Sequence, residues 1–122
     1  MKLRIRGNSI RLRLTKTEVT NLAEKGFVEE KTDFGNGQFF IYAVIASSET
    51  EIVKATFQDG RIEIFIPQAI AKDWAINNEV SISNEDDSLK ILVEKDFACL
   101  SLREGEDESD NFPHPKENEI SC

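Results

Sequence analysis

The 122-residue sequence is poor in the residue types on which most catalytic and metal sites depend. It contains two cysteines and one histidine. Two cysteines are too few for a small secreted scaffold held by disulfides, and a single histidine leaves no second imidazole for a catalytic dyad. A glycine-rich phosphate loop and a Gly-x-Ser-x-Gly motif are also missing. The sequence therefore favours a non-catalytic protein over an enzyme, and we expect no cofactor.

Long apolar runs are absent as well. No run approaches the roughly 20 residues that a membrane-spanning helix needs, and the basic first segment lacks the apolar core of a signal peptide. With 39% hydrophobic residues, eight of them phenylalanine, the chain can bury a core of one domain. We expect a cytoplasmic protein that does not enter a membrane.

Charge is distributed unevenly along the chain. The formal net charge is -8, but residues 1–16 carry six basic side chains and no acid. Residues 17–95 carry seven basic and fifteen acidic side chains, and residues 96–122 carry two and eight. Such a shift in composition is typical of a folded part followed by a tail. We predict a globular domain over 1–101 and an acidic, extended or flexible tail over 102–122, where little apolar surface is available to offset the entropy of ordering.

The first thirty residues carry strong local signals. Residues 2–6 and 9–14 alternate basic and apolar side chains, which predicts two half-buried strands, and Gly7-Asn8 supplies a two-residue turn. Thr15 followed by Glu18 is a capping box for a short helix. Gly26 is suited to end that helix.

Further strands are expected at 27–33, 38–47, 51–58, 61–66, 80–84 and 89–95. Residues 38–47 are apolar on both faces, which predicts a central strand. Asp59-Gly60 and residues 85–88 supply turns, and a second helix is expected to begin at Pro67 and stop at Asn77. The predicted fold class is α+β, with a mainly antiparallel sheet or barrel of about eight short strands and two short helices.

A shift of 52 residues aligns the chain with itself. Ile10, Leu12 and Leu14 then match Ile62, Ile64 and Ile66, while Leu22, Ala23 and Val28 match Trp74, Ala75 and Val80. This match indicates two strand–helix–strand units of one pattern. Equal periodicity in two unrelated units would give a similar match, so the sequence leaves both explanations open.

The basic hairpin is the strongest candidate for a binding site. The two-residue turn opposes Arg4 to Arg11 and Lys2 to Arg13, and it places Leu3 opposite Leu12 on the apolar face. Like charges directly opposite each other are destabilising, so an anion should lie nearby. The candidate anion- or partner-binding residues are Arg4, Arg6, Arg11 and Arg13.

Three sources of this anion remain open. Acidic strand residues such as Glu29, Glu30 or Glu63 could face the hairpin. The tail could fold back onto it, with docking residues Asp107, Glu108, Asp110 and Phe112. The third source is an external ligand, either an acidic protein or a phosphate-bearing molecule. Nucleic acid is disfavoured by the net charge and by the lack of aromatic residues between the arginines.

Metal binding and thiol chemistry have little support. Asp96, Cys99 and His114 are of metal-ligating types, but their spacing matches no zinc motif, and we expect no metal site. Cys99 alternates with Phe97, as a small buried apolar residue would.

Several segments together resemble a family of small uncharacterised bacterial proteins. They are the start M-K-L-R-I-R-G-N-S-I-R, the segment E-K-D-F-A-C-L at 94–100, and E-D-E-S-D with the following F-P at 106–113, with F-G-N-G-Q at 34–38 between them. The resemblance covers nearly the whole chain. It implies a bacterial, cytosolic, stand-alone domain and no mechanism.

A second segment is similar to the core of AbrB-like swapped-hairpin DNA-binding proteins. It runs from Gly60-Arg61-Ile62 through Ile64–Ile70 to Trp74 and Val80-Ser81-Ile82. In that family two strand–helix–strand units build a barrel, and basic barrel residues contact DNA. The resemblance implies a pseudo-dimer within one chain.

These observations lead to one functional hypothesis and one alternative. The hypothesis is a non-catalytic binding or interaction module whose basic hairpin face meets an acidic partner or the chain's own tail. The alternative is AbrB-like DNA binding, or binding of a phosphate-bearing ligand, through the same face.

Overall fold

A computed structural model of the chain describes residues 1–84, 88–97, 110 and 112. The predicted tail 102–122 and the predicted turn at 85–88 therefore lie largely outside the described residues. Within this part of the chain, neither helix is long or apolar enough to cross a membrane.

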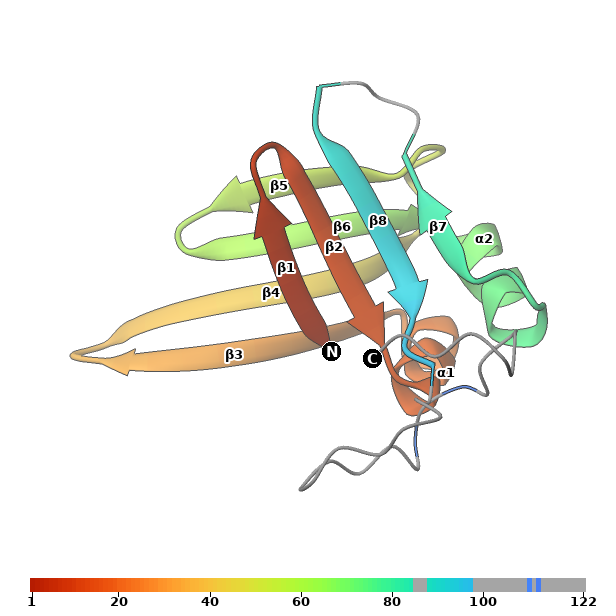
Figure 1. Cartoon of the computed structure of the whole chain (residues 1–122), viewed down its shortest axis with the longest axis horizontal. Helices are drawn as coiled ribbons and strands as arrows, with labels where there is room; N and C mark the ends of the chain where they lie inside the picture. Colours follow the sequence, from red (N-terminus) through yellow and green to blue (C-terminus); the bar gives the residue numbers. More distant parts are fainter. Residues whose placement is uncertain (85–87, 98–109, 111, 113–122) are drawn as a thin grey trace.

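The first half of the fold is a hairpin, a helix and a second hairpin (Figure 1). Its elements are β1 (Lys2–Arg6), β2 (Ser9–Leu14), α1 (Lys16–Lys25), β3 (Phe27–Gly35) and β4 (Gln38–Ser47). The register of β1 against β2 is the predicted one, from Lys2 opposite Arg13 to Arg6 opposite Ser9. The predicted caps of α1 are also confirmed: Thr15 and Glu18 form a capping box, and Gly26 ends the helix in a left-handed conformation.

The second half repeats this order. Its elements are β5 (Lys54–Gln58), β6 (Arg61–Pro67), α2 (Gln68–Ile76), β7 (Ser81–Ser83) and β8 (Lys90–Lys95). Strand β5 begins at Lys54, three residues later than the sequence predicts. In the register of β5 against β6, Ile52 would lie opposite Pro67, which has no N–H for a ladder hydrogen bond. Helix α2 follows Pro67 directly and, unlike α1, has no side-chain cap.

The strands form two mixed four-stranded sheets, in the orders β1-β2-β8-β7 and β3-β4-β6-β5. Each sheet has a parallel central pair, β2 with β8 and β4 with β6, flanked by antiparallel neighbours. The predicted α+β class with eight strands and two short helices is confirmed, and β4 is a central strand. The predicted barrel is wrong, because among the described strands none of one sheet pairs with a strand of the other.

Each sheet combines one hairpin from each half of the chain. The two parallel pairs begin with equivalent backbone hydrogen bonds, from Lys90 N–H to the Asn8 carbonyl (3.1 Å) and from Ile41 N–H to the Gly60 carbonyl (2.9 Å). The topology is therefore that of two equivalent hairpin–helix–hairpin units that exchange hairpins. We call them the first unit and the second unit.

The 52-residue spacing holds through the first hairpin and the helix of each unit and then ends. One residue, Gly26, links α1 to β3, whereas residues 77–80 link α2 to β7. Val44 and Val93 are equivalent residues, because Val44 pairs with Ile64 and Val93 pairs with Leu12, 52 residues before Ile64. Val28 pairs with Val44, and Ile82 pairs with Val93, so the structural counterpart of Val28 is Ile82. The predicted match of Val28 with Val80 is wrong because the longer link shifts the alignment.

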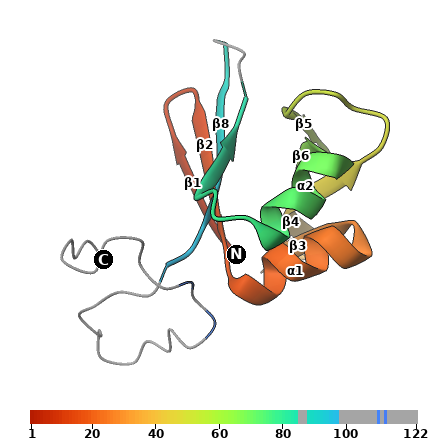
Figure 2. The same cartoon turned by 90° about the vertical axis from the view of Figure 1, so that its right-hand side faces the viewer.

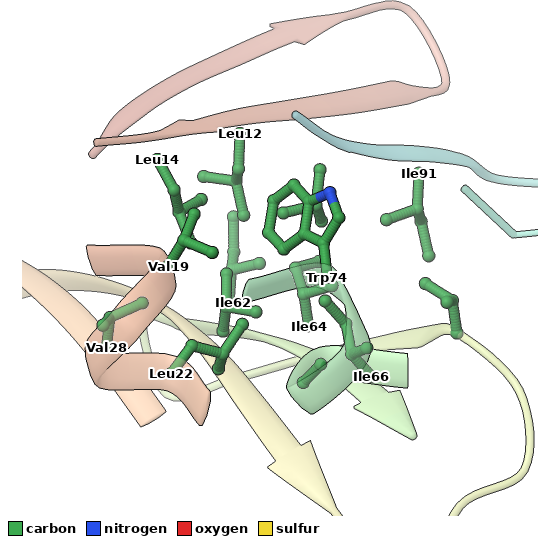
Figure 3. Packing of buried hydrophobic residues seen from close by; sticks show 14 residues of the cluster. Leu12, Leu14, Val19, Leu22, Val28, Ile62, Ile64, Ile66, Trp74 and Ile91 are labelled. Atoms are coloured by element: carbon green, nitrogen blue, oxygen red, sulfur yellow. The ribbon is translucent and has the colours of Figure 1, made fainter. Parts of the chain in front are cut away.

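One hydrophobic core joins the two sheets and both helices. Figure 3 shows Trp74 at the centre of this core. Leu12 and Ile91 of one sheet lie above it, and Ile64 and Ile66 of the other sheet lie below it. The Trp74 indole N–H donates a hydrogen bond to the Glu79 carbonyl (2.9 Å), so its polar atom is satisfied within the core. The remaining members are Leu14, Val19, Leu22, Val28, Val44, Val53, Ile62, Ala71 and Val93.

Candidate anion-binding face

The outer surface of the β1-β2-β8-β7 sheet carries the candidate site. Leu12 and Leu14 of β2 are fully buried, so the alternating residues Arg11 and Arg13 point to the opposite side of the sheet. Figure 2 shows this sheet nearly edge-on, with α1 and α2 on one side. The other side carries a group that we call the basic face, comprising Lys2, Arg4, Arg6, Arg11 and Arg13.

Strand β8 provides one acid to this face. In the parallel register Glu94 lies beside Arg13, and the Arg13 Nε to Glu94 Oε1 distance is 2.6 Å. The same carboxylate oxygen lies 3.7 Å from Arg11 Nε. A single carboxylate therefore serves two guanidinium groups.

A second acid lies at the end of the face. Lys2 Nζ is 3.2 Å from Asp96 Oδ2, and Asp96 is only 7% exposed. Asp96 is thus paired with a lysine. Across the described part of the chain, no three His, Cys, Asp or Glu side chains gather to hold a metal. Cys99 and His114 lie outside the described residues.

The acidic residues that the sequence analysis proposed as partners of the basic face form ion pairs elsewhere. Glu29 and Glu63 both pair with Arg61, at 3.0 and 3.1 Å, on the other sheet. Glu30 lies 3.4 Å from the Met1 amino group. The hypothesis that these three acids neutralise the basic face is wrong; the acids that do lie there, Glu94 and Asp96, come from β8 and the residue that follows it.

Arg4 and Arg6 have no ion pair within the described residues. Both lie on β1, an edge strand that pairs with β2 alone among the described strands. A shallow hollow of about 190 Å³ opens beside Arg4 and is lined by Lys2, Leu3, Arg4, Arg11 and Arg13. Small-molecule sites usually measure about 300–1,000 Å³. The hollow therefore suits one anionic group better than a whole nucleotide.

Asp110, a predicted docking residue, contacts the start of α1. Its carboxylate accepts hydrogen bonds from the Thr17 N–H (3.1 Å) and the Thr17 hydroxyl (2.8 Å), and its carbonyl accepts from the Lys16 N–H (2.9 Å). The hydrogen bond from the Thr17 side chain lowers the pKa of the Asp110 carboxyl. These contacts satisfy N–H groups that a helix leaves free at its first turn.

Phe112 contacts the end of β8. Its N–H donates to the Asp96 carbonyl (2.9 Å), and its ring packs edge-on against Phe97 with centroids 5.8 Å apart. Asp110 and Phe112 thus lie against the fold, but no contact joins either to the four arginines among the described residues. Asp107 and Glu108 lie outside the described part.

Lys95 is a buried residue that the sequence analysis did not single out. It is 5% exposed, and its ammonium lies 5.1 Å from the Phe112 ring centre and 5.6 Å from that of Trp74. It donates a hydrogen bond to the Asn77 carbonyl (2.9 Å). Burial lowers the pKa of the Lys95 ammonium. Its alternation with Ile91 and Val93 along β8 was the available signal for an inward-pointing lysine.

These features define a class of small α+β domain, built from two hairpin–helix–hairpin units and carrying basic residues on one outer sheet face. More particularly, the chain belongs to a family of unknown function (DUF7009), whose sequence pattern matches residues 1–116. The resemblance to a family of uncharacterised proteins is confirmed to that extent. No curated protein and no solved structure matches the chain.

Proposed function

We propose that this chain is a non-catalytic binding module whose basic face binds an acidic partner. Two observations carry the proposal together. Arg4 lies directly opposite Arg11 on the neighbouring strand, and neither Arg4 nor Arg6 has an ion pair among the described residues. Like charges in directly opposite positions destabilise a sheet. A bound anionic group at the hollow beside Arg4 would relieve this repulsion.

Carboxylates fit the face well because it is formed by arginines. A guanidinium offers a planar fork of N–H donors that matches a carboxylate or phosphate with two hydrogen bonds. Glu94 shows that this face attracts a carboxylate, since its Oε1 lies 2.6 Å from Arg13 Nε and 3.7 Å from Arg11 Nε. An acidic peptide segment would present several such groups along β1.

The second unit does not carry an equivalent face. At the 52-residue spacing, the counterparts of Arg4, Arg6, Arg11 and Arg13 are Thr56, Gln58, Glu63 and Phe65. A palindromic DNA site would meet both units of a pseudo-dimer, and only one of them is basic. This asymmetry favours an acidic protein over duplex DNA.

DNA binding of the AbrB-like kind is the second candidate. It is favoured by one observation, the arrangement of two hairpin–helix–hairpin units that exchange hairpins. If DNA is the ligand, affinity should fall steeply with salt, because each neutralised phosphate releases counterions.

Binding of poly-L-glutamate, heparin and duplex DNA to the full chain, measured over a salt series, tests the proposal. We expect Arg4→Gln/Arg6→Gln to weaken poly-L-glutamate binding about tenfold or more, since hydrogen bonds to charged groups contribute roughly 1.5–3 kcal/mol each. The matched control is Lys54→Gln/Lys72→Gln, which removes two exposed charges away from the basic face. Equal binding by both variants would contradict the proposal, and a preference for duplex DNA would support the second candidate.

The chain's own acidic residues are tested separately. Replacing Glu104, Glu106, Asp107 and Glu108 by their amides leaves Asp110 and Phe112 in place. If these acids occupy the basic face, the variant should bind poly-L-glutamate more tightly than the wild type. Unchanged affinity would rule them out as the partner.

A further inference from the structure

The free edge of β1 adjoins the basic face. Strand β1 pairs with β2 on one side, and within the described part of the chain no strand pairs with its other side. Four of its five residues are exposed. An unpaired edge is a ready template for an added strand.

We infer that the acidic partner docks as an extended strand along β1, with acidic and apolar residues in alternation. This inference rests on the proposed function and adds the conformation and the sequence pattern of the partner. In this mode of recognition, main-chain hydrogen bonds supply affinity and alternate side chains supply specificity.

The two faces of β1 determine the pattern of the partner. Lys2, Arg4 and Arg6 lie on the basic face, whereas Leu3 and Ile5 lie on the face that carries Leu12. Ile5 is nevertheless 53% exposed. An added strand would place its acidic residues beside the three cations and cover Ile5 with an apolar residue, because directly opposite side chains in neighbouring strands lie about 4.5–5.5 Å apart at Cβ.

The backbone register leaves suitable groups at this edge. In a hairpin with a two-residue turn, the residues that flank the turn form a hydrogen-bonded pair, here Arg6 and Ser9. Alternation then directs the main-chain groups of Arg4 and Lys2 toward β2 and those of Leu3 and Ile5 toward the free edge. The N–H and C=O groups of Leu3 and Ile5 are therefore the anchors for the partner's backbone.

Other edges lack this combination. Strand β5, the counterpart of β1, carries one basic residue, Lys54, where β1 carries three. Strand β7 has only three residues. Strand β3 mixes Glu29, Lys31 and Asp33 on its outer face. Among the described edges, β1 is thus the one with like charge on alternate residues.

Charge and pattern argue against two alternative occupants, residues 104–109 of this chain and a second copy of β1. Residues 104–109 of this chain, Glu-Gly-Glu-Asp-Glu-Ser, include no apolar side chain to cover Ile5. The like charges of β1 oppose pairing with a second copy of β1, since two basic strands would repel each other. An acidic segment with apolar residues at alternate positions satisfies both faces.

Three blocked peptides provide the test on the full chain. One has the alternating sequence Glu-Val-Glu-Val-Glu-Val-Glu, the second has the same composition with its acids and valines in separate blocks, and the third is the alternating peptide N-methylated at its valines. We expect the alternating peptide to bind about tenfold tighter than either other peptide, and to slow amide exchange at Leu3 and Ile5 by a similar factor. Ile5→Pro, which removes an edge N–H, should abolish that preference while leaving the amide exchange of β2 unchanged.

The outcomes separate this inference from the proposed function. If all three peptides bind equally and Arg4→Gln/Arg6→Gln weakens all of them, the basic face binds acids and strand addition is wrong. If no peptide and no poly-L-glutamate binds, the proposed function itself is wrong. The N-methylated peptide keeps the test decisive if Ile5→Pro does not fold.

Discussion

Leu12 and Ile64 occupy equivalent positions in the two units, and each forms a parallel pair with a fully buried valine. Leu12 pairs with Val93, and Ile64 pairs with Val44. None of these four side chains has any exposed surface. Each pair joins a first hairpin of one unit to a second hairpin of the other, so the core is built where the units exchange strands.

Truncation at these positions should be costly in both halves. We expect Leu12→Ala and Ile64→Ala each to lower the free energy of unfolding by about 2–5 kcal/mol, because a buried aliphatic side chain is replaced by a cavity. Urea denaturation monitored by Trp74 fluorescence measures this. The matched controls are Ile5→Ala and Phe57→Ala. Ile5 and Phe57 are also equivalent to each other, but they are 53% and 68% exposed. Each control substitution should lower the free energy of unfolding by less than about 1 kcal/mol. A large cost in one unit only would show that the two halves do not share one cooperative core.

Local signals in the sequence predicted most of the secondary structure. The alternation of residues 2–6 and 9–14 with Gly7-Asn8 between them was enough to give the register of β1 against β2. The capping box of α1 was also readable, since it depends on residues three apart. The late start of β5 follows from the same rule, since the two-residue turn at Asp59-Gly60 places Ile52 opposite Pro67, but the prediction of a strand from residue 51 overlooked the missing N–H of that proline.

The candidate site was predicted in part. The basic residues could be assigned to one sheet face because side chains alternate along a strand. Glu94, the acid that contacts Arg11 and Arg13, is contributed by the parallel pairing of β2 with β8, which are far apart in the chain. No local pattern reveals such a pairing. The hypothesis that Glu29, Glu30 and Glu63 fill this role failed for the same reason.

Gly60 is expected to tolerate substitution less well than Gly7. Both glycines have positive φ, +73° and +53°, which costs an L-residue roughly 1–2 kcal/mol. A Cβ at Gly60 would also lie 2.9 Å from the Phe39 carbonyl oxygen, whereas nothing lies within 4 Å of one at Gly7. Gly60→Ala should therefore lower the free energy of unfolding more than Gly7→Ala does in urea denaturation. Equal costs would contradict the close approach of the β5–β6 turn to β4.

Acid should weaken the contact between Asp110 and α1. Because the hydrogen bond from Thr17 lowers the pKa of Asp110, the folded state holds fewer protons on this group than the unfolded state does. The contact therefore contributes fully above the ordinary carboxyl pKa of about 3.9 and is lost as the pH falls through the lowered value. The amide shift of Thr17 in an NMR titration should report this transition.

Asp110→Asn provides the comparison for that titration. The variant keeps an oxygen acceptor but has no proton to gain, so the Thr17 transition should disappear. A wild-type Thr17 signal that does not move below pH 4, with the rest of the spectrum folded, would contradict the role of Asp110 as a cap.

Lys95 should impose a pH dependence on stability in the alkaline range. Burial lowers the pKa of its ammonium, so the folded chain loses this proton at lower pH than the unfolded chain does. Between the two pKa values the unfolded state holds more protons, and the free energy of unfolding therefore rises with pH up to about 10.4.

The variant Lys95→Met lacks this contribution. We expect the wild type to gain stability relative to Lys95→Met between pH 8 and pH 10.4 in parallel urea titrations, with Lys72→Met as the control for loss of an exposed lysine on α2. If the wild type instead loses stability relative to Lys95→Met over that range, then the contacts of the charged ammonium with Trp74, Phe112 and the Asn77 carbonyl outweigh the cost of its burial.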